Sequence, residues 1–117
     1  MHSEQTLELA QDSLEDLKAR DIRVFDVREL TTVADYLLIA SGTSDRHVRS
    51  LSEKIIRQFK EAGEPPLGIE GQDAGEWILI DLHDVIVHVM QPRTREFYKL
   101  EDLWALGSGP EMEHAGN

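Results

Sequence analysis

Two adjacent apolar segments limit the folds open to this chain more than any other feature of its sequence. Residues 76–82 and 85–90 are rich in Val, Ile and Leu, and only His83 and Asp84 separate them. Two strands joined by so short a connection pair antiparallel, so the segment predicts a tight hairpin. Residues 35–40 are apolar throughout their interior, which is typical of a central strand covered on both faces. The chain therefore needs helices to cover a sheet.

Helical spacing of apolar residues appears on both sides of that central strand. Residues 3–20 repeat apolar side chains every three or four positions and carry acidic residues elsewhere, which predicts an amphipathic helix. A second helix begins near Ser44, a good N-cap, and ends before Gly63 and the Pro65-Pro66 pair. Its predicted buried stripe consists of Val48, Leu51, Ile55 and Phe59. The remaining elements are two shorter strands and a helical or irregular segment opened by Pro92: residues 21–27, 67–71 and 92–104.

This order of elements predicts the α/β class, as a single domain with a mixed sheet of about five strands flanked by helices. The chain has 117 residues, of which 40% are hydrophobic, enough for one core with little room for a second. From Gly107 onward there are glycines, a proline and almost no apolar residues. We therefore expect a domain over residues 1–104 and a disordered tail over residues 105–117.

Charge and composition restrict the partners and the compartment. The 23 acidic and 12 basic side chains give a net charge of −11, which disfavours free nucleic acid and favours a basic protein surface. The chain has no cysteine, so disulfide and thiol chemistry are excluded. Neither a signal sequence nor a membrane-spanning apolar run occurs in it. We expect a soluble cytoplasmic protein with no membrane partner.

The Ser41–His47 turn joins a strand to a helix N-terminus, an arrangement that often holds phosphate. One alternative is therefore a metal-dependent nucleotidyltransferase that uses residues 42–45 with Asp81 or Asp84. Those two carboxylates are three residues apart and would face opposite sides of an extended strand, and a Walker-type lysine is absent. The sequence favours a helix cap and a tight turn here.

Other polar residues give weaker functional signals. His83 and His88 match no common metal-ligand spacing, and a nucleophile elbow is absent, so we expect no metal, cofactor or catalytic residue. Basic side chains of the second helix alternate with acidic ones, which favours a solvated, salt-bridged face. A local contact with RNA, within a larger interface, is the alternative. The residues in question are Arg46, Arg49, Lys54, Arg57 and Lys60.

Alternation along the hairpin divides its side chains between two faces. Ile78, Ile80 and Leu82 share one face with Val85, Val87 and Val89, which suits a helix-covered core. The other face carries an indole, aliphatic groups and a few polar groups, the composition of a protein interface. It could equally be covered by the first helix or by the C-terminal segment, and both can hold at different ends. Its residues are Trp77, Leu79, Asp81, Ile86, His88 and Met90.

Several motifs, in order and spacing, resemble those of the ribosomal silencing factor family, also called RsfS or Iojap. The resemblance covers about residues 3–104. Position 83, often glycine in the family, is histidine here. The matching segments are Asp35-Tyr36, residues 41–48, residues 68–71, residues 77–82, residues 84–89 and residues 95–104.

The resemblance implies a nucleotidyltransferase-like fold without enzymatic activity. It implies a homodimer when free and binding to the large ribosomal subunit through that subunit's fourteenth protein, with at most a peripheral contact with ribosomal RNA. Occupying this site would block association with the small subunit and repress translation when nutrients are limiting. The expected ribosomal contacts are Trp77, Asp81, His88, Arg95 and Tyr98, with Glu70 and Asp84 as weaker candidates.

Overall fold

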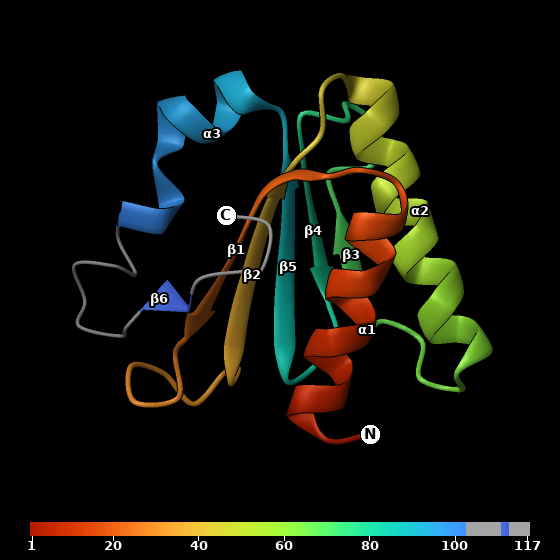
Figure 1. The fold of residues 1–117 in the computed structure, drawn as a ribbon, viewed down its shortest axis with the longest axis vertical. Coiled ribbons are helices and arrows are strands. Elements are labelled where there is room, and N and C mark those ends of the chain that lie inside the picture. Colours follow the sequence, from red (N-terminus) through yellow and green to blue (C-terminus); the bar gives the residue numbers. More distant parts are fainter. Residues whose placement is uncertain (103–110, 113–117) are drawn as a thin grey trace.

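The fold is one mixed sheet whose two faces are covered to different extents (Figure 1). The structure, a computed structural model, describes residues 1–102 and 111–112. Its sheet has the strand order β3-β4-β5-β2-β1-β6, in which β2 and β5 are parallel and the other neighbours are antiparallel. The expected α/β architecture is confirmed. The elements are α1 (Ser3–Asp16), β1 (Arg20–Asp26), β2 (Tyr36–Ser41), α2 (Asp45–Glu61), β3 (Gly68–Glu70), β4 (Trp77–Asp81), β5 (Val85–Met90), α3 (Pro92–Tyr98) and β6 (Glu111–Met112).

The helices α1 and α2 lie side by side on one face, which we call the first face (Figure 1). The inward side chains of β4 and β5 pack there against the predicted stripe of α2, and all of these are buried. Strand β2 is buried along its whole length, as its apolar sequence predicts. No helix among the described residues is long and apolar enough to cross a bilayer.

The first helix is shorter than its spacing predicts. It ends at Asp16 instead of residue 20, because Lys18 turns the chain with a φ of 60° and β1 already begins at Arg20. Leu17, one of the apolar side chains repeated at helical spacing within residues 3–20, therefore lies outside the helix and is 37% exposed. A register shift between Arg20 and Arg23 accompanies the entry into β1.

The opposite face of the sheet, the second face, carries a smaller apolar cluster. Phe25, Leu37, Ile39 and Met90 are buried there, with Leu100 packed against them. The predicted alternation of β4 and β5 is confirmed by their register, in which Trp77 pairs with Met90 and Leu79 with His88.

Exposure along this face is uneven. Met90 and His88 are buried, so at this end of the face the covered alternative holds. Leu79, Asp81 and Ile86 remain half-buried. Leu100, in the chain after β5, packs against the cluster that contains Met90, and the Trp77 indole contacts His88.

Most of residues 105–117 lie outside the described residues, so the expected disordered tail stays a prediction. The two residues that are described, Glu111–Met112, form β6 and pair with Val24 and Phe25 of β1.

Candidate functional site: an aromatic surface beside a buried ion pair

The candidate site starts at the N-terminal end of β4, where the Trp77 indole lies over the second face. Its Nε1–H donates to Nδ1 of His88 at 2.9 Å. An indole nitrogen can only donate, so Nδ1 must be unprotonated and the imidazole neutral. Burial lowers the pKa of His88 to about 4, in agreement with this bond. His88 therefore holds the indole in place, and His88 itself is only 7% exposed.

Two further rings extend the indole toward solvent. The Tyr98 ring lies 5.0 Å from that of Trp77, and Phe97 packs edge-on against Tyr98 at 4.9 Å. Phe97 is 77% exposed and Tyr98 is 57% exposed. We call Trp77, Phe97 and Tyr98 the aromatic surface. Exposed aromatic groups next to one another have the composition of a binding hot spot.

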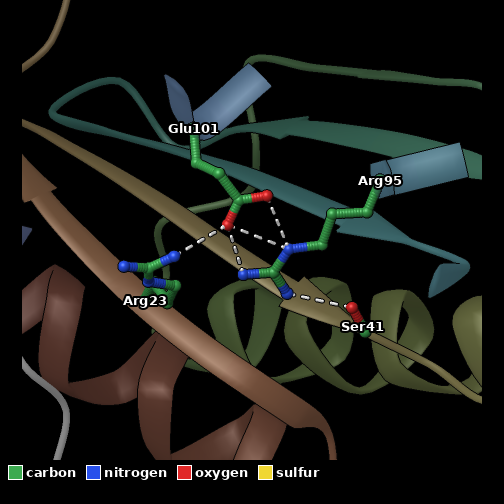
Figure 2. Close-up of polar contacts among 4 residues, drawn as sticks. All are labelled: Arg23, Ser41, Arg95 and Glu101. Atoms are coloured by element: carbon green, nitrogen blue, oxygen red, sulfur yellow. Dashed lines mark hydrogen bonds and ion pairs between the residues drawn. The ribbon is translucent and has the colours of Figure 1, made fainter. Parts of the chain in front are cut away.

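A buried ion pair attaches α3 to the sheet at this position (Figure 2). The Arg95 guanidinium donates to both carboxylate oxygens of Glu101, through Nε at 2.9 and 3.1 Å and through Nη2 at 2.8 Å. Its Nη1 donates to Ser41 Oγ at 2.9 Å, at the end of β2, and Arg23 reaches Glu101 at 3.4 Å. Arg95 is only 8% exposed.

The electrostatics of Glu101 follow from these contacts. Burial raises the pKa of the Glu101 carboxyl, but hydrogen bonding and charge from Arg95, and then from Arg23, outweigh burial and leave the pKa below its usual value. Glu101 is thus ionised at neutral pH and completes a charge-assisted, bidentate pair.

The acidic candidates lie away from the aromatic surface. Asp81 is on the same face of β4 as Trp77 but four residues along, which is about 13 Å. Its carboxylate accepts from the backbone N–H of His83 at 2.9 Å. Asp84 lies in the hairpin turn, and Glu70 is exposed on β3 opposite Leu79. The structure brings together Trp77, His88, Arg95 and Tyr98, and leaves these carboxylates along the rest of the face.

Three backbone N–H groups of the Ser41–His47 turn donate to groups within the fold. Gly42 N–H donates to Met90 O, Thr43 N–H to His47 Nδ1, and His47 N–H to the capping Ser44 Oγ. With Nδ1 accepting, His47 Nε2 donates to Leu17 O at 2.8 Å and so links α2 to the end of α1. A Cβ at Gly42 would lie 2.9 Å from Val48, so the turn packs directly on the helix. The turn is a helix cap and an interhelical link.

The residues that the nucleotidyltransferase alternative needs are at opposite ends of β5. Gly42 bonds to Met90 at one end, whereas the Asp84 carbonyl accepts from Tyr36 N–H at the other, and six strand residues span about 17 Å or more. Among residues 1–102 and 111–112, no three His, Asp or Glu side chains are grouped so that they could hold a metal ion.

The basic side of α2 is partly paired, as the alternation of its charges predicts. Arg49 bonds to Asp45 at 2.7 Å and to the carbonyl of Asp73, and Lys54 lies 3.8 Å from Asp16. Arg49 and Lys54 therefore already have partners within the same chain.

Sequence reasoning missed Phe97 and Glu101. Both lie in the segment that resembles the family, but α3 has only seven residues, too few for a helical period to separate exposed from buried positions. Arg95 and Glu101 are six residues apart in the sequence. This spacing brings the two side chains together only because the chain turns after α3. Lys99 supplies that turn with a φ of 50°.

Comparisons with known proteins all point to one family. A family model described as "Ribosomal silencing factor during starvation" matches residues 1–116. A ribosomal silencing factor RsfS from Chromobacterium violaceum is 40% identical over 104 residues, covering 89% of this chain and 85% of that protein. A crystal structure of a protein from the same organism superposes with a TM-score of 0.88 at 38% identity, covering 98% of this chain and 93% of the other.

A mouse protein named "Mitochondrial assembly of ribosomal large subunit protein 1" is also similar. It is 40% identical over 93 residues, which cover 77% of this chain and 41% of the mouse protein. Its name connects that protein with the large ribosomal subunit.

Proposed function

Because the chain belongs to the ribosomal silencing factor family, we propose that it binds the large ribosomal subunit and sterically blocks association with the small subunit. Translation would then be repressed when nutrients are limiting. The name of the mouse relative supports the choice of subunit. The proposed contact on that subunit is its fourteenth protein, with ribosomal RNA contributing only a peripheral contact. No catalytic residue, metal or cofactor enters this proposal.

The observation that carries the proposal is the exposure of Phe97 and Tyr98 beside Trp77 on a strongly acidic chain. Aromatic anchors supply much of the affinity of protein interfaces, and complementary charge accelerates encounter and selects orientation. A net charge of −11 suits a basic ribosomal protein and is repelled by the surrounding RNA.

The proposal gives the predicted site residues different roles. Trp77 and Tyr98 are anchors, and we add Phe97 to them. Asp81 is the charge partner for a lysine or arginine, and Glu70 and Asp84 are weaker contacts farther along the second face. His88 supports the indole, and Arg95 supports α3. Removal of the anchors should cost at least ~2 kcal/mol of binding free energy, the range of hot-spot aromatics.

Sedimentation of ribosomal subunits tests this function directly. Excess protein should reduce the 70S peak that forms from purified subunits, and a variant with both Phe97→Ala and Tyr98→Ala should not. Leu67→Ala is the matched control, because Leu67 is an apolar side chain of similar exposure, 67%, located before β3. If 70S particles form normally in excess wild-type protein, the proposed function is wrong.

Binding of isolated RNA distinguishes the RNA alternative. If the second helix were the principal contact, the chain would bind isolated ribosomal RNA with an affinity that falls steeply with salt. We expect no such binding at physiological salt, because a net charge of −11 repels RNA and Arg49 and Lys54 already have acidic partners within the fold.

Two further expectations belong to the same proposal. The resemblance implies a homodimer in the free state, which sedimentation equilibrium would detect as a mass near twice that of the chain. We also expect the cytoplasm to be the site of action, which fractionation with ribosomes would test.

A further inference from the structure

Arg95 was expected to touch the ribosome, but its position suggests a different contribution. Arg95 is 8% exposed, and all three guanidinium nitrogens already donate to Glu101 or Ser41. A side chain bonded in this way presents few donors to a partner. Its contacts instead connect three separate parts of the chain: α3, the segment after α3, and the end of β2.

Burial alone does not hold the rings of the aromatic surface in position. The helix α3 has seven residues and no side-chain bond at its N-cap, so it has little stability of its own. Phe97 and Tyr98 are mostly exposed and bury too little area to fix the helix. The position of their rings must be set by neighbouring contacts.

The ion pair has the geometry to set that position. Phe97 and Tyr98 lie between Arg95 and Glu101 in the chain, and Lys99 turns the backbone so that Glu101 returns to Arg95. Ser41 then joins the pair to the sheet (Figure 2). A bidentate arginine–carboxylate pair fixes orientation as well as distance.

We propose that Arg95, clamped by Glu101 and Ser41, is a positioning residue that holds Phe97 and Tyr98 in place beside Trp77 for binding. This inference rests on the proposed function, because it concerns the same surface. Holding the rings before encounter lowers the ordering cost of association. Ser41, the first residue of the Ser41–His47 turn, thereby acquires a role at the site.

A double-mutant cycle on large-subunit affinity tests the inference. Arg95→Met should weaken binding about tenfold in the wild-type background, as expected when pre-organisation is lost, but less than about threefold when Tyr98→Ala is already present. Arg95→Lys keeps the positive charge but loses the planar guanidinium that makes the bidentate contact. Its affinity should therefore lie between those of the wild type and Arg95→Met. If Arg95→Met costs the same factor in both backgrounds, Arg95 touches the subunit itself and the inference is wrong.

Ring resonances give a readout that needs no ribosome. The chain has two tyrosines, Tyr98 at the site and Tyr36 buried in β2, so each can be assigned by substitution. In Arg95→Met and Arg95→Lys the Tyr98 ring signals should move toward those of a free tyrosine, because the Trp77 ring 5.0 Å away no longer shields them, while Tyr36 stays unchanged. Unmoved Tyr98 signals in both variants would overturn the inference.

The two readouts separate this inference from the proposed function. If Tyr98→Ala leaves large-subunit affinity unchanged, the aromatic surface is not the binding site and the proposed function loses its site. The Tyr98 resonances of the Arg95 variants would still decide whether the ion pair positions α3.

Discussion

Protonation of His88 should destabilise the fold as pH falls, by an amount that the structure allows us to estimate. The imidazole is buried and accepts from the Trp77 indole, and its pKa is lowered from 6.5 to about 4. Between these values the unfolded chain binds a proton that the folded chain does not. Stability is therefore fully present above the unfolded pKa, falls with pH below it, and levels off below the folded pKa.

The magnitude follows from the difference between the two pKa values. Each pKa unit corresponds to about 1.36 kcal/mol, so the full effect is about 3 kcal/mol. Between about pH 7.5 and about pH 4.5 the His88 contribution to the free energy of unfolding should fall by about 2.5 kcal/mol. Urea unfolding at a series of pH values, followed by far-UV circular dichroism, measures this loss.

His88→Gln isolates the contribution of the imidazole. The glutamine amide oxygen can accept from the Trp77 indole and does not titrate, whereas all other acidic and basic groups remain. The difference in stability between wild type and this variant should change by about 2.5 kcal/mol across the same pH range. Parallel pH profiles would mean that His88 is not held as a buried neutral acceptor.

Three other substitutions test local features of the fold by urea or thermal unfolding. His83→Gly should stabilise by about 0.5–1 kcal/mol, because His83 has a φ of 78° at the centre of a tight turn and glycine adopts this conformation without strain; His83→Ala should give no gain. Gly71→Ala should lower the free energy of unfolding by at least about 2 kcal/mol, since Gly71 has a φ of +87° and a Cβ would lie 2.0 Å from the Trp77 carbonyl oxygen. Gly68→Ala is the control: nothing lies within 4 Å of its Cβ, so the free energy of unfolding should change by less than about 0.5 kcal/mol. His47→Ala should cost about 1–2 kcal/mol by removing the bonds of both ring nitrogens, and an unchanged stability would contradict the structural role of the turn.

The elements of the sheet were largely predictable because strand periodicity is local. Alternation along β4 and β5 assigns Trp77 and His88 to one face and Ile78 and Val87 to the other, and the register confirms it. The cap at Ser44 was predictable for the same reason, since its hydrogen bond reaches only three residues ahead. The early end of α1 was not, because Lys18 adopts a positive φ without a glycine to signal it.

The arrangement of the candidate site was less predictable because it depends on contacts far apart in the chain. Alternation places His88 and Met90 on the second face but does not reveal that the Trp77 indole contacts His88 or that the chain after β5 returns over the Met90 cluster. The contact that fixes this covering joins Arg95 to Ser41, 54 residues away. Whether Arg95 reaches a partner or an internal carboxylate is a question of tertiary structure, and its residue type suits both roles.

The central claim is that the exposed rings of α3 bind the large ribosomal subunit. The most direct measurement is the equilibrium affinity of purified large subunits for wild-type protein and for the variant with both Phe97→Ala and Tyr98→Ala, with Leu67→Ala as control. We predict at least about thirtyfold weaker binding for the double variant, which corresponds to a cost of ~2 kcal/mol, and wild-type affinity for the control. Equal affinity of the folded double variant and the wild type would contradict the claim.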